Sequence, residues 1–318
     1  MSRRNPSTGA EAAPRTVSLA GSLKRFAARL PLHVALIGFM VLWSIPTLAL
    51  LISSFRDPIA IASSGWWTVI NDPFDFTLDN YDSVLSQRGM ARSFLNSMII
   101  TFPATILVIL VAAFAAYAFA WMQFPGRNIL FLVVVALLVV PLQMTLIPVL
   151  RFYVTLNDNI GFINNDLPIL GGNLFGVNSF TGLWVAHVAY GLPFAIFLMR
   201  SFFGSLPKEL FESAYLDGAS DLRVFFRIVL PLSGPVIAAL AIFQFLWVWQ
   251  DLLIALVLLG DPDMAPMMLT INSLVSSFGS DYQVLTAAAF LSMIVPLFIF
   301  FALQRHFVQG LLAGSVKG

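Results

Sequence analysis

Few side chains in this sequence could do chemistry, and the most suggestive of them surround one carboxylate. Asp251 follows Gln244, Trp247 and Gln250 in a long apolar run, and it is the one carboxylate that we expect inside a membrane-spanning segment. An Asp at mid-membrane costs about 2.5–3.5 kcal/mol on insertion scales, so it should face protein or water. The group could line a polar pathway for a hydroxyl-rich solute, with indole faces stacking on sugar rings. Alternatively, Asp251 is a buried, hydrogen-bonded strut that fixes helix packing, which we favour for Asp251 itself.

The motifs of common enzymes are absent from the sequence. It has no Gly-x-x-x-x-Gly-Lys-Ser/Thr loop, no His-Glu-x-x-His and no Gly-x-Ser-x-Gly. The three histidines, His33, His187 and His306, are too scattered for a short metal motif, and His187 fits a packed polar residue better than a ligand. Zero cysteines exclude disulfides and thiolate sites. We therefore expect no catalytic residue, metal or cofactor on this chain, and no nucleic-acid partner; active transport would need energy from another subunit or an ion gradient.

Composition predicts a polytopic membrane protein. The 318 residues are 59% hydrophobic and 10% charged, whereas soluble chains are about 45–50% apolar and about 25% charged. We expect an all-α membrane protein with six transmembrane helices, at about 32–54, 94–120, 128–150, 182–200, 234–259 and 284–303. The domain organisation is then a basic N-terminal tail (1–31), a six-span domain (32–304) and a C-terminal tail (305–318). Within the six-span domain lie two polar loops, at 205–233 and 261–283.

Charge distribution predicts the orientation. With the N-terminus placed inside, thirteen of the 17 Lys and Arg residues fall on the inner side, as the positive-inside rule requires. Both termini and the loop 205–233 are then cytoplasmic. The acid-rich stretch 56–90, the Asn- and Gly-rich stretch 153–181 and the loop 261–283 are then external.

Two prolines interrupt the third expected span. Pro141 and Pro148 enclose a polar pair, Gln143 and Thr145. Such prolines can simply kink a helix, but broken helices beside a cavity are also where transporters bind substrate. Both interpretations remain open, and the second would add Gln143 to the pathway.

The loop 205–233 has the signals of a helix-turn-helix elbow. Ser205, as a capping serine, and Pro207 mark the start of a helix that should run to about Asp217. Gly218 permits a turn, and Ser220 with Asp221 should cap a second short helix that ends near Pro231. From composition alone, the first helix could lie against lipid headgroups or dock on another protein.

The spacing within this elbow resembles the EAA loop of membrane subunits of binding-protein-dependent ABC importers. The pattern is Glu-x-Ala-x-x-Asp-Gly-Ala, followed nine residues later by Ile-x-Leu-Pro, with Ser213 in place of the first of two alanines. The resemblance implies a type I importer permease whose coupling helix seats in a cleft of a cytoplasmic ATPase. The residues that it implicates in coupling are Glu212, Ser213, Ala214, Tyr215, Asp217, Gly218, Ala219, Ile228, Leu230 and Pro231.

The resemblance extends over nearly the whole chain from His33. The segments 124–127, 141–148, 191–196 and 307–318 are similar to the second, six-span permease of maltose-type carbohydrate importers, closest to its α-glucoside branch. This implies a bacterial inner-membrane heterodimer with a second homologous permease, two cytoplasmic ATPase subunits that hold ATP and Mg, and an external sugar-binding protein. By the same analogy, Asn272, Ser273 and Ser276 contact the binding protein, and Gly314, Ser315 and Lys317 approach the ATPases.

The implied function is uptake of a di- or oligosaccharide, such as the α-glucosides maltose or trehalose, by alternating access. The alternative from another class is a self-contained secondary sugar transporter or channel in which Asp251 carries a proton. The sequence does not determine which sugar is carried, or whether this subunit touches it.

Overall fold

The computed structural model describes residues 19–71, 76–87, 89–160, 176–277 and 282–315, and within these ranges the regular elements are all helices. The chain divides into two compact units, Met1–Ile52 and Ser53–Gly318. Helix α1 (Leu19–Ser54) makes up the described part of the first unit and begins within the segment expected as a tail. Its portion Arg29–Ser54 is long and apolar enough to cross a membrane.

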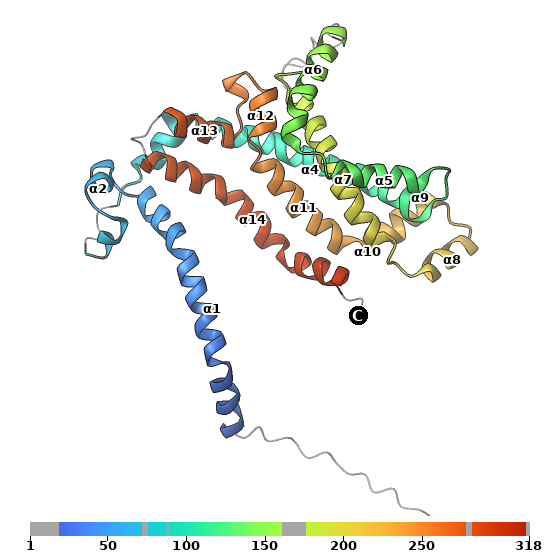
Figure 1. Cartoon of the computed structure of the whole chain (residues 1–318), viewed down its shortest axis with the longest axis horizontal. Coiled ribbons are helices and arrows are strands. Elements are labelled where there is room, and N and C mark those ends of the chain that lie inside the picture. The colour runs from blue at the N-terminus through green and yellow to red at the C-terminus, as the bar shows by residue number, and fades with distance from the viewer. Residues whose placement is uncertain (1–18, 72–75, 88, 161–175, 278–281, 316–318) are drawn as a thin grey trace, which may run out of the picture. The chain divides into compact units, whose positions relative to one another are not determined.

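The second unit is built on four long helices. Helix α4 (Met90–Trp121) packs along α7 (Phe180–Phe203) and α11 (Gly234–Trp249), and α11 in turn packs on α14 (Tyr282–Ser315) (Figure 1). Small side chains let α4 approach its neighbours closely: Ala104, Ala112 and Ala116 of this helix are fully buried. The core of the unit therefore lies along α4.

The third expected span is broken. Helix α5 (Arg127–Leu137) and helix α6 (Leu142–Ile160) meet at an angle of 105°. The break precedes Pro141, whose ring disfavours a helical residue before it, whereas α6 continues through Pro148. Of the two interpretations left open, the broken helix applies at Pro141. Helix α6 also extends into the stretch expected as an external loop, and residues 161–175 of that stretch lie outside the described residues.

The fifth expected span also differs from the continuous helix that we predicted. Helix α11 ends at Trp249, and α12 (Leu253–Leu258) begins after a non-helical step at residues 250–252. Asp251 thus lies at a break between two helices and not inside one. The described residues contain four single helices that could span a membrane, and up to six spans if two bent pairs, Arg127–Leu137 with Leu142–Leu156 and Asp221–Leu232 with Gly234–Trp249, each count as one.

The loops carry more helix than expected. The segment expected to be external includes η6 (Pro262–Met264) and α13 (Met267–Ser277), and α14 continues to Ser315 through most of the expected C-terminal tail. The stretch after α1 contains α2 (Pro58–Ser63), η1 (Trp66–Ile70), α3 (Asp79–Asp82) and the π-helix η2 (Ser83–Gln87). The guanidinium of buried Arg56 organises α2 and η1 by donating to the Gly65 carbonyl (2.9 Å) and the Ser64 hydroxyl (2.6 Å).

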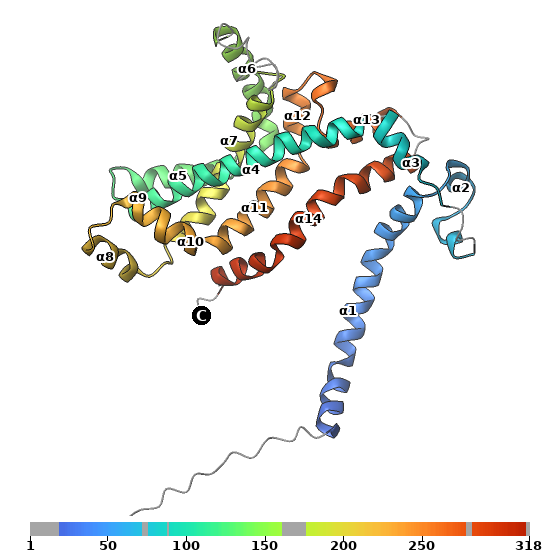
Figure 2. The same ribbon diagram turned by 180° about the vertical axis from the view of Figure 1, so that it is seen from behind.

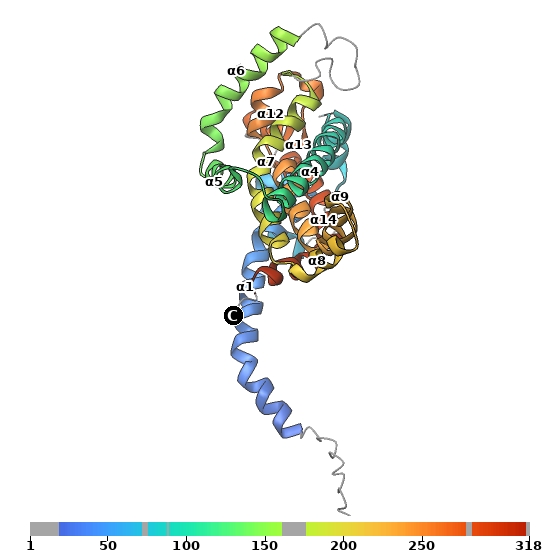
Figure 3. The same ribbon diagram turned by 90° about the vertical axis from the view of Figure 1, so that its right-hand side faces the viewer.

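The second unit has two distinct ends. The predicted elbow comprises α8 (Lys208–Leu216), α9 (Asp221–Val224), the π-helix η5 (Phe225–Val229) and α10 (Leu230–Leu232). It joins α7 to α11 at one end of these helices, while α12 and α13 lie toward the other end (Figures 2 and 3).

Candidate functional site

The elbow turns at Gly218, as the sequence predicts. Gly218 has φ +74°, in the left-handed region that favours glycine. The Ala219 amide donates to the Ala214 carbonyl (2.9 Å) and the Gly218 amide donates to the Tyr215 carbonyl (3.0 Å). These two bonds form a Schellman motif, which satisfies carbonyls that the end of α8 would otherwise leave unpaired.

The predicted serine caps of the elbow are wrong. The Ser205 hydroxyl donates to the Phe202 carbonyl (2.7 Å), and the residue at the N-cap of α8 is Pro207. Ser220 does occupy the N-cap of α9, but its side chain makes no capping hydrogen bond. Both helices therefore begin close to where the sequence indicates, without the hydroxyl contacts that the pattern suggested.

An aromatic stack fastens α8 to α4. The ring centroids of Trp121 and Phe211 lie 3.6 Å apart, and the ring planes make an angle of 18°. The Trp121 indole N–H donates to the Phe203 carbonyl (3.0 Å) at the end of α7, and Phe211 is 2% exposed. Trp121 thus joins the ends of α4 and α7 to the elbow. No local pattern in the sequence marks this contact, because its partners are far apart along the chain.

A second link uses hydroxyl groups. The Tyr215 hydroxyl donates to Asp221 Oδ1 (2.8 Å) and lies 3.5 Å from the Tyr117 hydroxyl of α4. Partial desolvation, together with the neighbouring Asp221 carboxylate, raises the pKa of the Tyr215 phenol. The two arms of the elbow are therefore tied to each other and to α4.

The predicted coupling residues divide into two sets. Those packed against the chain's own core are Ala214, Ala219, Ile228 and Leu230. Those exposed on the elbow are Glu212, Ser213, Tyr215, Asp217, Gly218 and Pro231. Leu216, which the motif did not implicate, is 89% exposed between two of the exposed positions. The elbow thus presents a mixed surface of carboxylates, small residues and several large apolar side chains, of which Leu216 is the most exposed.

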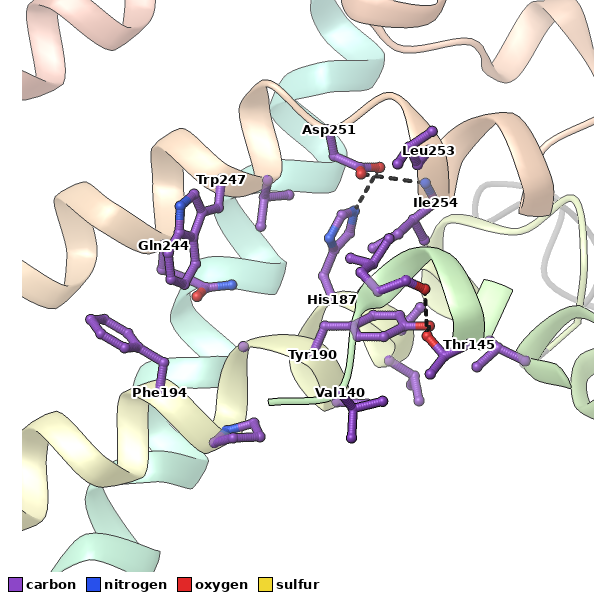
Figure 4. A pocket seen from close by; sticks show the side chains of 18 of the residues that line it. Val140, Thr145, His187, Tyr190, Phe194, Gln244, Trp247, Asp251, Leu253 and Ile254 are labelled. Carbon is purple, nitrogen blue, oxygen red and sulfur yellow. Dashed lines mark hydrogen bonds and ion pairs between the residues drawn. The ribbon is translucent and has the colours of Figure 1, made fainter. Parts of the chain in front are cut away.

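A pocket lies between α5, α6, α7, α11 and α12 (Figure 4). Its volume is about 880 Å³, and most of its lining is apolar. The polar lining residues are Thr145, Tyr153, His187, Tyr190, Gln244, Gln250 and Asp251, with the indole of Trp247 beside them. Four of the five predicted pathway residues therefore come together, whereas Gln143 is exposed and does not line the pocket.

Asp251 holds the break between α11 and α12. Its carboxylate accepts hydrogen bonds from the backbone amides of Ile254 (3.3 Å) and Ala255 (3.1 Å), so it caps α12. Its Oδ2 also lies 3.8 Å from His187 Nε2 on α7. These contacts support the strut interpretation, while the residue still lines the pocket. His187 is 5% exposed, as a packed polar residue should be.

The other polar contacts of the pocket lie on α6 and α7. The Thr145 and Tyr190 hydroxyls are 2.7 Å apart. The rings of Phe194 and Trp247 lie with centroids 5.2 Å apart and form an aromatic wall. Tyr190 was not predicted, because nothing in the apolar sequence around it distinguishes it from a core residue.

The remaining predicted contacts lie at the periphery. Asn272 and Ser273 are exposed on α13, and Ser276 belongs to the same helix. Gly314 and Ser315 end α14, and Lys317 lies outside the described residues. Within the described ranges, no cluster of three or more side chains could hold a metal ion.

Comparison with known proteins identifies the family. A family described as "Binding-protein-dependent transport system inner membrane component" matches residues 108–312, which is more than half of the chain. The chain belongs to this family. It is a multi-pass inner-membrane permease subunit of an ABC transporter and not an enzyme.

Two relatives and one solved structure illustrate the similarity. The osmoprotective compounds uptake permease protein GgtD of Synechocystis sp. is 52% identical over 293 residues, which cover 91% of this chain and 92% of the relative. The alpha-glucoside transport system permease protein AglG of Rhizobium meliloti is 40% identical, covering 90% and 96%. A crystal structure of a bacterial alginate ABC importer matches with a TM-score of 0.69 at 18% identity, over 91% of this chain and 98% of that one. The fold is that of a type I ABC importer permease.

Proposed function

We propose that this permease subunit forms half of the translocation pathway of an ATP-driven importer for a neutral di- or oligosaccharide. The observation that carries the proposal is the elbow, which presents an exposed surface around Glu212 and Leu216 while its other face is fastened to α4 and α7. A segment tied to two spans can transmit a push from a cytoplasmic partner to both. Closure of an ATPase dimer would then rock the spans as rigid bodies.

The exposed elbow residues would contact the ATPase. Glu212, Ser213, Tyr215 and Asp217 offer polar contacts, and Leu216 offers an apolar anchor. Ala214, Ala219, Ile228 and Leu230 would act from beneath, by holding the elbow on the core. Gly218 would set the angle between the two arms. This division refines the expectation that Ala214 takes part in coupling, since its methyl group packs against its own chain.

The complete transporter would contain four further partners and the surrounding lipid. These are a second homologous permease, two ATPase subunits that carry ATP and Mg, and an external sugar-binding protein. Both termini and the elbow would be cytoplasmic. Asn272, Ser273 and Ser276 of α13 would meet the binding protein, and Gly314, Ser315 and Lys317 would approach the ATPases.

The pocket and the names of two relatives support the proposed substrate class. One relative is named for osmoprotective compounds and another for alpha-glucosides. An uncharged α-glucoside, such as trehalose or maltose, would fit both names. It would also fit a pocket that combines an aromatic wall with Gln244, Gln250 and Asp251.

The alternative is a secondary sugar transporter in which Asp251 carries a proton. Against it, the carboxylate already accepts two backbone hydrogen bonds at the start of α12. Protonation would weaken that cap in each cycle. In the importer, Asp251 can remain a fixed support while energy comes from the ATPases.

The test is ATP hydrolysis by the complex purified through a tag on this chain, with and without binding protein and candidate sugars. We expect an ATPase to co-purify with the chain. We expect binding protein loaded with one sugar to stimulate ATP hydrolysis, and that sugar is then identified as the substrate. A chain that purifies alone and transports sugar in proteoliposomes without ATP would overturn the proposal.

A further inference from the structure

The pocket contains a buried amide that is not satisfied within the described chain. Gln244 is 2% exposed, and its Oε1 has no hydrogen-bond partner among the described residues. Leaving a buried polar group unpaired costs about 1–3 kcal/mol. An apolar side chain of the same length would pack here without that cost. The position of Gln244 is therefore better suited to a ligand than to packing.

The amide is directed toward the pocket. Figure 4 shows the Gln244 side chain extending from α11 toward the space beside His187 and Tyr190, both of α7. Room for it comes from Gly191, because a Cβ at that position would lie 2.6 Å from Gln244 Nε2 and 2.7 Å from Oε1. Because Gly191 on α7 has no Cβ, there is room for the Gln244 amide of α11.

The rest of the lining favours an uncharged ligand. Asp251 is the one carboxylate among the lining residues, and no Lys or Arg is among them. An anionic sugar would meet this carboxylate without a compensating cation. The Thr145 and Tyr190 hydroxyls and the aromatic pair Phe194 and Trp247 offer hydrogen bonds and a ring face instead.

We propose that this chain itself binds one uncharged, hydroxyl-bearing ring of the substrate in this pocket, with the Gln244 amide hydrogen-bonded to a ring hydroxyl. The inference rests on the proposed function, since it requires a sugar to pass beside this chain. An amide offers both a donor and an acceptor, and a hydroxyl is the group that can pair with either. The volume of about 880 Å³ falls in the range of about 300–1,000 Å³ that is usual for small-molecule sites.

The test compares substrates that differ in one hydroxyl. The transported glucoside and its monodeoxyfluoro analogues have similar shapes, but fluorine cannot donate a hydrogen bond. Uptake into proteoliposomes is measured with the complete complex and saturating, preloaded binding protein. The preference of wild type for the hydroxyl compound is then divided by the preference of the variant. This ratio cancels the selectivity of the binding protein, which is the same in both measurements.

Two variants perturb the amide in different ways. Gln244→Met removes it at nearly constant length, and Gly191→Ala keeps it but displaces it, because the added methyl occupies its place. For one analogue in the series, we expect both variants to lose a wild-type preference of roughly 3- to 10-fold, the value of one neutral hydrogen bond. Gln123→Met is the matched control, since Gln123 is exposed in the turn between α4 and α5, and it should keep the full preference.

Thermal unfolding separates binding from packing. Gln244→Met should unfold at the same temperature as wild type or higher, because it removes an unsatisfied amide. If wild type transports the sugar but both variants keep its preference for every hydroxyl, the subsite is refuted while the importer stands. If Gln244→Met alters the preference only together with a large loss of stability, Gln244 is a packing residue and the subsite is again refuted. If wild type shows no sugar-dependent uptake, the failure lies with the proposed function.

Discussion

Replacing Trp121 tests whether the elbow works through α4. Trp121→Ala would remove the ring stacked on Phe211 and the hydrogen bond to the Phe203 carbonyl. An aromatic pair contributes about 0.5–1.5 kcal/mol beyond the area that it buries, and a hydrogen bond adds about 0.5–1.5 kcal/mol. With the loss of half-buried apolar surface, the docking of α8 should weaken by about 2–4 kcal/mol, or about 30- to 1,000-fold.

Two assays measure the weaker docking of α8. Hydrogen exchange should show lost amide protection in α8, with the protection of α4 and α7 unchanged. ATPase measurements should show that loaded binding protein no longer stimulates hydrolysis, and uptake should fall with it. Trp121→Phe keeps a ring but loses the N–H donor, so we expect an intermediate loss of about 1 kcal/mol.

The control is Trp67→Ala, which removes the same side chain from an exposed position, 60% accessible, in η1. It should leave both the protection of α8 and the ATPase stimulation at wild-type values. If Trp121→Ala keeps wild-type stimulation although α8 has lost its protection, then docking of the elbow on α4 is not part of the coupling. That result would refute the reasoning above.

Three further predictions concern other positions. At Gly218, a Cβ would meet no described atom within 4 Å, so the constraint on this position is conformational. Gly218→Asn should keep most uptake, whereas Gly218→Val should lose about 1–2 kcal/mol of elbow stability. Gly218→Pro should abolish uptake without affecting membrane insertion. Asp251→Asn should retain at least half of ATP-driven uptake, because an amide oxygen can still cap α12, whereas Asp251→Leu should lose it; complete loss in the Asn variant would favour the proton-carrying alternative. Arg56→Met should leave buried carbonyls unpaired and expose the 56–70 segment to protease in right-side-out vesicles, and a wild-type digestion pattern would contradict that role.

Local signals in the sequence explain what could be predicted. Long apolar runs indicate spans because the bilayer core demands them. The turn at Gly218 was predictable because only glycine adopts its φ of +74° at no steric cost. Pro141 likewise marked a possible break. The gathering of Gln244, Trp247, Gln250 and Asp251 was predictable because they follow one another within eight residues.

Features that depend on distant partners could not be predicted. The break after Trp249 contains neither glycine nor proline, and it is held by Asp251 capping α12 and approaching His187 of another helix. The stack on Phe211 depends equally on how α4 and the elbow meet in space. Conversely, the segment expected as a C-terminal tail is largely helical, since α14 continues past Gly310 to Ser315.

The contact between Trp121 and Phe211 also has a consequence for biogenesis. Ninety residues separate the two rings in the chain, and a ribosome adds about 5–20 residues per second. The aromatic end of α4 is therefore made several seconds before the ring that covers it. During that interval the Trp121 indole lacks the ring that covers it in the folded chain. A nascent chain arrested before Phe211 should leave Trp121 open to chemical modification, and one arrested well after it should protect it.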